Sequence, residues 1–217
     1  MTFDLFDALD AAESAVEPLA DGAMVLRGFA RSMQDELLAD VQAVIAAAPL
    51  RHLITPGGLR MSVAMTNCGA LGWVSDRRGY RYDPIDPERG APWPAMPASF
   101  TRLAAQAASS AGFEGFVPDA CLINRYEPGA KLSLHQDRDE HDYGAPIVSV
   151  SLGLPAVFLF GGLSRADKAM RTRLRHGDVV VWGGPSRLRF HGVLPLGDGD
   201  HALLGKQRIN LTFRRAD

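Results

Sequence analysis

The part of the chain after residue 119 is built from short apolar runs, and this limits the folds open to it. The runs are rich in Val, Ile, Leu and Phe and are separated by Gly, Pro or Asp. They are ACLINRY (120–126), KLSLHQD (131–137), PIVSVSL (146–152), AVFLF (156–160), DVVVW (178–182), LRFHGVL (188–194) and QRINLTF (207–213). Strands of this length at such close spacing predict an antiparallel sandwich or barrel.

Two helices are predicted, both before the strand-rich region. The segment 32–49 repeats apolar residues at helical spacing, and Ser32 with Asp35 forms the expected capping pair at its start. The segment 98–112 carries an apolar stripe and ends at Gly112, a residue favoured just past a helix C-terminus. We therefore expect an α+β fold that is mainly β, with the helices covering a sheet.

Composition indicates one globular, cytoplasmic domain. The 217 residues can bury one sizeable core, and the net charge of −2 argues against adhesion to polyanions through a strong overall field. Cys68 and Cys121 are too few for a disulfide framework and favour a reduced compartment. No segment is apolar over the length that a membrane span needs. We expect an acidic tail over residues 1–17 and a single domain over 18–217.

A long segment between the two predicted helices, residues 55–97, is rich in Gly and Pro and carries Trp73, Tyr80, Tyr82 and Trp93. Loops of this length in a compact domain are usually lids or binding loops. An irregular cover that packs its aromatic side chains on the sheet is an equally open interpretation.

The run that contains His135 also carries a pattern of acidic residues. Side chains alternate along a strand, so His135, Asp137 and Asp139 should share one face, opposite Leu132. Together with His191, the His-x-Asp pair can form the facial triad typical of a ferrous ion. The signal is weak by itself, because such pairs arise by chance and a lone histidine in an apolar strand is more often a hydrogen-bonded core residue.

The last run, QRINLTF, strengthens the hypothesis of a metal site. Four polar residues alternate with Ile209, Leu211 and Phe213, and they are Arg208, Asn210, Thr212 and Arg214. An exposed sheet edge could carry two arginines, but in a barrel this face lines the interior, where buried arginines need anions. Guanidinium groups pair with carboxylates through two hydrogen bonds, so a dicarboxylate fits. Iron with a dicarboxylate indicates an oxygenase that uses 2-oxoglutarate.

Four separated segments then resemble the AlkB family of iron and 2-oxoglutarate dioxygenases. They are NRYEPGAKLSLHQDRDE (124–140), PIVSVSLGLPAVFLFGG (146–162), HGDVVVWGGPSRLRFHGV (176–193) and RINLTFR (208–214). The segment MSVAMTNCGALGWVSDRRGYRYDPIDP (61–87) resembles the family's bacterial nucleotide-recognition lid. The resemblance implies a double-stranded β-helix (jelly-roll) core over 113–217, a substrate lid over 55–97 and oxidative demethylation of alkylated bases such as 1-methyladenine and 3-methylcytosine.

The resemblance also implies roles for particular residues. Fe(II) would be held by His135, Asp137 and His191, and O2 would complete the reaction. The residues implied for 2-oxoglutarate are Asn124, Arg125, Tyr126, Arg208, Asn210 and Arg214. Those implied for the substrate are Trp73, Tyr80, Arg81, Tyr82, Arg165 and Asp139, the last as the carboxylate at the catalytic site that contacts the exocyclic amine of the base.

The expected partner is alkylated single- or double-stranded DNA, or RNA, and the chain is expected to act as a monomer in direct-reversal DNA repair. The basic segment SRADKAMRTRLRH (164–176) is expected to bind a few phosphates. Two other classes remain open. An oxygenase for proteins or small molecules would share the iron and 2-oxoglutarate residues, and a metal-free or zinc-bound binding barrel would share only the sheet.

Overall fold

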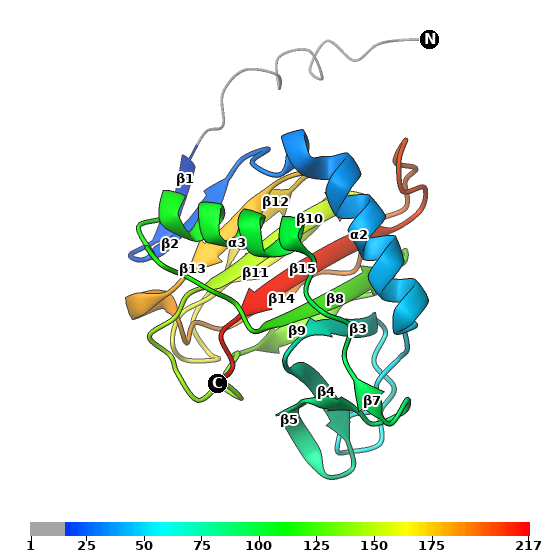
Figure 1. Ribbon diagram of the computed structural model, residues 1–217. Helices are drawn as coiled ribbons and strands as arrows, with labels where there is room; N and C mark the ends of the chain where they lie inside the picture. Colours follow the sequence, from blue (N-terminus) through cyan, green and yellow to red (C-terminus); the bar gives the residue numbers. More distant parts are fainter. Residues whose placement is uncertain (1–15) are drawn as a thin grey trace.

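In the computed structural model, which describes residues 16–217, two antiparallel sheets pack against each other (Figure 1). The larger sheet has the order β1 (Val16–Ala20), β2 (Ala23–Leu26), β13 (Val179–Trp182), β10 (Ile147–Gly153), β15 (Arg208–Arg214), β8 (Ala120–Tyr126) and β3 (Ala64–Gly69). The smaller sheet has the order β12 (Met170–Leu174), β11 (Ala156–Phe160), β14 (His191–Val193) and β9 (Leu132–His135). The mainly β, jelly-roll architecture is confirmed.

Each of the seven predicted runs forms a strand, but the sequence patterns did not reveal β1, β2 and β3 of the larger sheet or β12 of the smaller sheet. The side chains of β12 alternate between the exposed Arg171 and Arg173 and the buried Thr172 and Leu174. Only two residues of this strand are buried, so its basic outer face dominates the sequence. The structure shows that part of the segment expected to form a basic rim is an edge strand of the smaller sheet.

Two helices lie across one face of the larger sheet, α2 (Gln34–Ala47) and α3 (Ala98–Ser110) (Figure 1). The core beneath them includes Leu37 and Phe100 from the helices and Leu211 from β15. The expected cap of Ser32 with Asp35 is wrong, because α2 follows a 3-10 turn (Arg31–Met33) and makes no side-chain cap hydrogen bond. A second core lies between the two sheets.

The segment 55–97 contains more regular structure than an irregular cover would. After β3, a hairpin of β4 (Gly72–Asp76) and β5 (Gly79–Asp83) projects from the lower end of the molecule in Figure 1, and a short ladder of β6 (Ile85–Asp86) and β7 (Ala91–Pro92) follows. Trp93 packs with Val74 and anchors the hairpin.

Most of the expected acidic tail, residues 1–15, lies outside the described residues, and β1 begins at Val16. No helix within residues 16–217 combines the length and the apolar character that crossing a membrane requires.

His176 joins the start of α2 to the end of β10 on the larger sheet. Its Nδ1 accepts a hydrogen bond from the Gly153 N–H (2.9 Å), so its Nε2 carries the proton and donates to Gln34 Oε1 (2.9 Å). The ring stacks on His201 at 4.6 Å between centroids. Burial and the charges of His201 and Arg31 lower the pKa of His176 to about 4, although Asp178 opposes the shift.

We predict that this histidine makes the fold acid-sensitive. The unfolded chain takes up the His176 proton near pH 6.5, whereas the folded chain does so only near pH 4. Stability from this group is therefore constant above about pH 6.5 and falls as the pH drops toward 4. Urea unfolding at pH 7 and pH 5 measures the free energy of unfolding, which should fall less between the two pH values for His176→Gln than for wild type. In a His141→Gln control, at an exposed site, it should fall as much as in wild type. An equal fall in all three proteins would contradict the prediction.

Candidate metal centre and lid

Three side chains that could hold one metal ion converge at one end of the smaller sheet. His135 ends β9, His191 begins β14, and the two are register partners with ring centroids 4.4 Å apart. Asp137 Oδ1 lies 3.5 Å from His135 Nε2 and 3.7 Å from His191 Nε2. Ligand atoms of all three lie within 4.8 Å of one another. Two imidazoles and one carboxylate form the donor set of the facial triad, which suits ferrous iron and leaves one side of the ion open.

Backbone hydrogen bonds fix which nitrogen each ring presents. Nδ1 of His135 lies 2.8 Å from the Ser133 carbonyl oxygen, and Nδ1 of His191 lies 3.1 Å from that of Arg189. A carbonyl only accepts, so each Nδ1 carries the proton and each Nε2 offers its lone pair. Burial, with the charge of His135, lowers the pKa of His191 to about 4, which keeps that ring in the neutral form that metals bind.

The regular alternation that placed Leu132 opposite the metal residues does not hold. Leu132 packs against the same core between the sheets that borders His191, because the pairing of β14 with β9 shifts register between His191 and Val193. Moreover, β9 ends at His135, so Asp137 and Asp139 lie in the segment that follows the strand. The prediction that His135, Asp137 and Asp139 share one strand face is therefore wrong, although His135 and Asp137 do converge.

A buried arginine neutralises the candidate carboxylate ligand. Nε of Arg214 donates to Asp137 Oδ2 at 2.8 Å, and Nη2 of Arg214 makes an ion pair with the same oxygen. Burial would raise the pKa of Asp137, but Arg214 and the two histidines hold it well below its ordinary value. Glu140 lies 3.2 Å from Arg214 Nε and 3.2 Å from Arg187 Nη2, which makes a buried network of two acids and two arginines.

Arg208, on the same face of β15, lacks such a partner. It is 1% exposed, lies over the Tyr126 ring at 4.9 Å and donates from Nη2 to Ser151 Oγ at 2.9 Å. Its Nε and Nη1 are buried without a hydrogen-bond partner, and no carboxylate among residues 16–217 forms an ion pair with it. Burial lowers its pKa. An unpaired buried guanidinium fits an anionic ligand, and a carboxylate is the group that matches its geometry.

Two amides lie beside this guanidinium in the interior. Asn124 Nδ2 lies 3.3 Å from Asn210 Oδ1, and Asn124 Oδ1 is buried without a partner. Arg125 is separated from them, because side chains alternate along β8, and its Nη2 lies 3.5 Å from Glu127 Oε1. The two-arginine clamp expected from the sequence therefore has one arginine available to a ligand and one already engaged by protein carboxylates.

The hairpin of β4 and β5 places an aromatic face against the segment that follows Asp137. Trp73 and Tyr80 stack with centroids 5.5 Å apart, and Trp73 Nε1 donates to Asp139 Oδ2 at 2.8 Å. The Tyr82 hydroxyl donates to Glu140 Oε1 at 2.8 Å. The hairpin is thus joined by hydrogen bonds to the second and third residues after the candidate metal ligand.

Two residues implied for substrate binding lie elsewhere. Arg81 is the register partner of Val74, on the opposite face of the hairpin from Trp73, and it pairs with Asp76 (3.1 Å) and Asp83 (3.5 Å). Arg165 lies in the exposed loop between β11 and β12.

Sequence reasoning missed Glu140 and Arg187, although both are almost fully buried in the site network. Glu140 was hidden in the acidic run 137–140, where a carboxylate is usually solvated. Sequence reasoning also missed Ser149 and Ser151, because serines in an apolar run do not indicate a role. Both are buried, and their hydroxyl groups lie beside Asn210 and Arg208.

Comparison with known proteins gives the site a family context. Residues 22–214 match the 2OG-Fe(II) oxygenase superfamily. The chain is 59% identical to the alpha-ketoglutarate-dependent dioxygenase AlkB of Escherichia coli (strain K12), covering 98% of each protein. It is 36% identical to the nucleic acid dioxygenase ALKBH1 of Mus musculus over 60% of this chain and 34% of that one. The solved structure of OsALKBH1 superposes with a TM-score of 0.81 at 30% identity, covering 93% of this chain and 100% of that chain.

We predict that replacing the two arginines of β15 affects stability differently. Arg208→Met removes a buried, unpaired charge and should leave the free energy of unfolding unchanged or higher in protein freed of metal and small molecules. Arg214→Met leaves the buried charges of Asp137 and Glu140 without the guanidinium that balances them, and should lower the free energy of unfolding by about 3–5 kcal/mol. Denaturant unfolding measures both, with exposed Arg102→Met as the control. Equal losses for Arg208 and Arg214 would contradict the assignment of their partners.

Proposed function

The chain belongs to the AlkB family of 2OG-Fe(II) oxygenases, and from that membership we propose that it demethylates alkylated nucleic-acid bases of the 1-methyladenine and 3-methylcytosine type. One relative is named a nucleic acid dioxygenase, which supports this substrate class. The observation that carries the proposal is the hydrogen bond from Trp73 to Asp139, which holds an aromatic face beside the metal centre.

The Fe(II) ligands proposed are Nε2 of His135, a carboxylate oxygen of Asp137 and Nε2 of His191. Arg214 keeps Asp137 ionised, and the backbone carbonyls behind the rings take both Nδ1 atoms, so that Nε2 is the nitrogen each ring turns to the metal. Bound Fe(II), with 2-oxoglutarate and O2, supplies hydroxylation of the N-methyl carbon, with succinate, CO2 and formaldehyde as products. The protein supplies position, charge and exclusion of water around that chemistry.

For 2-oxoglutarate, the proposed contact is a carboxylate on the guanidinium of Arg208. Nε and Nη1 of this buried group have no hydrogen-bond partner, so it still has donors for a carboxylate. Asn124, Asn210 and Tyr126 border the same interior face of the large sheet, where amide and hydroxyl groups can orient the rest of the molecule. The proposed role of Arg214 is to hold Asp137, and the same guanidinium also pairs with Glu140.

The hairpin is proposed to receive the methylated base. A base must leave its helix to reach the metal centre, and methylation on its pairing edge weakens the pair that retains it. The Trp73 and Tyr80 rings offer a stacking surface, and a methylated base that carries positive charge is further favoured by an aromatic face. Asp139 is proposed to accept a hydrogen bond from the exocyclic amine, and Arg165 to contact a phosphate. Both single- and double-stranded DNA, and RNA, are compatible with this chemistry, and the chain is proposed to act as a monomer in the cytoplasm.

We predict that repair and 2-oxoglutarate turnover separate in lid variants. Trp73→Ala removes the stacking face without touching a metal or 2-oxoglutarate residue, so kcat/KM on a methylated oligonucleotide should fall at least about 5-fold. Succinate formed without nucleic acid should be unchanged. Trp73→Phe keeps a ring but loses the donor to Asp139, and should retain most of the stacking contribution. Succinate and formaldehyde measured in parallel on 1-methyladenine and 3-methylcytosine oligonucleotides check this.

Two results would count against the proposal. Wild-type repair by Trp73→Ala would make the hairpin structural cover. Succinate production without formaldehyde from any methylated oligonucleotide would instead favour an oxygenase that acts on proteins or small molecules.

A further inference from the structure

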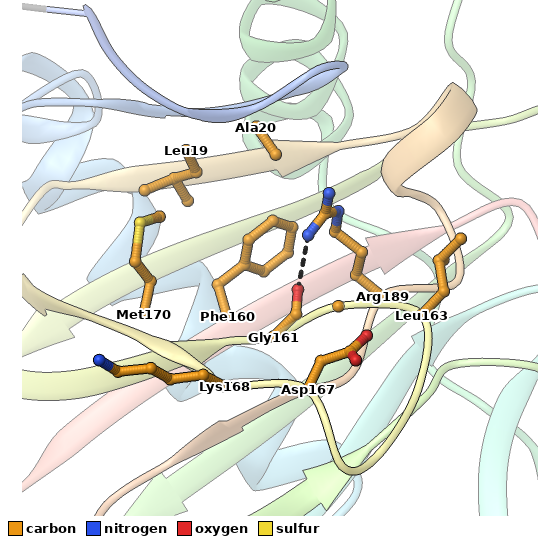
Figure 2. Close-up of a pocket in the computed structure, with 10 residues that line it drawn as sticks. Leu19, Ala20, Phe160, Gly161, Leu163, Asp167, Lys168, Met170 and Arg189 are labelled. Atoms are coloured by element: carbon orange, nitrogen blue, oxygen red, sulfur yellow. Dashed lines mark hydrogen bonds between the residues drawn. The ribbon is translucent and has the colours of Figure 1, made fainter.

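A surface pocket lies at the same end of the smaller sheet as the metal centre. Its volume is about 520 Å³, and it is formed by the end of β11, the loop to β12, the segment before β14 and the end of β1 (Figure 2). Its lining includes Phe160, Leu163, Asp167, Lys168, Met170 and Arg189.

The pocket lies next to the strand that begins with the candidate metal ligand His191. Phe160 is the register partner of His191, and the Arg189 carbonyl oxygen lies 3.1 Å from His191 Nδ1. In the smaller sheet, β9 forms one edge and β12 the other. The lid is bonded to the residues just after β9, whereas this pocket is bordered by β12, so the metal centre lies between the lid and the pocket.

The walls of the pocket combine apolar surface with a held guanidinium. Leu163 is 60% exposed and Met170 46% exposed, so the wall of the pocket presents two large apolar side chains to solvent. Arg189 lies over the Phe160 ring at 5.7 Å, and its Nη1 donates to the Gly161 carbonyl oxygen at 2.8 Å (Figure 2). Its Nε is buried without a partner. Guanidinium planes fixed in this way are surfaces on which unpaired bases stack.

The charge around the pocket favours a phosphate. Lys168 lies on its rim and is exposed, and it also lines a second hollow of about 590 Å³ that includes Arg171. Asp167 is the acidic wall residue, and its Oδ2 accepts the Ser164 N–H at 3.0 Å, which commits that oxygen to the loop. The two hollows share Lys168 and Met170 as lining residues, so they adjoin each other on this side of the smaller sheet.

We propose that this pocket binds a nucleotide next to the target base in the same strand. The base lies against Arg189, Leu163 and Met170, and Lys168 neutralises its phosphate. The proposal rests on the proposed function, because it requires a nucleic-acid substrate. It makes the β11–β12 side of the molecule a second contact that a methylated mononucleotide cannot use.

The test compares kcat/KM for a methylated pentanucleotide and for 1-methyladenosine monophosphate, with formaldehyde as the product measured. Met170→Glu should lower kcat/KM at least about 5-fold on the pentanucleotide and leave the mononucleotide unchanged, because it opposes stacking and phosphate binding in the pocket alone. A pentanucleotide that lacks the base next to the methylated one should lower kcat/KM of wild type by a similar factor. The same change of substrate should lower kcat/KM of Met170→Glu much less.

Lys168→Gln, with Lys206→Gln as the matched control, separates a phosphate contact from the general field. Lys206 is also exposed but lies beside the start of β15, at the opposite end of that strand from Arg214. The slope of log kcat/KM against log salt on the pentanucleotide should become shallower by roughly 0.7 for Lys168→Gln only.

The outcomes distinguish the two proposals. If wild type is active and neither Met170→Glu nor Lys168→Gln changes the kinetics on the pentanucleotide, the pocket proposal alone is overturned. Equal effects of Lys168→Gln and Lys206→Gln would also overturn it, as would an equal fall in kcat/KM of Met170→Glu on the mononucleotide. A wild type that releases no formaldehyde from either methylated substrate overturns the proposed function and the pocket proposal with it.

Discussion

The buried ion pair of Asp137 with Arg214 is the interaction on which the site depends. One carboxylate oxygen of Asp137 faces both histidine Nε2 atoms, and the other is held by the guanidinium. Asp137 follows β9 of the smaller sheet and Arg214 ends β15 of the larger sheet, so the pair joins the two sheets at the metal centre. Breaking such a pair leaves an uncompensated charge in the interior, so metal binding and folding share one contact.

The same network positions the lid. Glu140 accepts from Tyr82 on the hairpin and pairs with Arg214 and Arg187, and Asp139 accepts from Trp73. The aromatic face is therefore fixed relative to the metal centre by consecutive acidic residues on one short segment. A hairpin attached in this way can present its rings to a base without a long, mobile loop. The arrangement also explains why Arg208, away from this network, is the arginine left for a ligand.

Sequence patterns predicted the fold class, the seven core strands and the polar interior face of β15, because period-two alternation survives where strands are regular. They failed where that condition breaks. The register shift beside His191 brings Leu132 into the core, and the exposed arginines of β12 mask a strand with only two buried residues. The partner of Arg214 could not be predicted, because the sequence contains many carboxylates and only the packing of the sheets selects Asp137 and Glu140.

Anaerobic titration with Fe(II) and 2-oxoglutarate, followed by visible absorption, tests the central role of Asp137 most directly. The account predicts a charge-transfer band that requires both additions and reaches one complex per chain. The band should be lost in Asp137→Asn and kept in Asp139→Asn, which lies two residues further along the same segment and contacts the lid. Equal bands in both variants, or no band in wild type, would contradict the account.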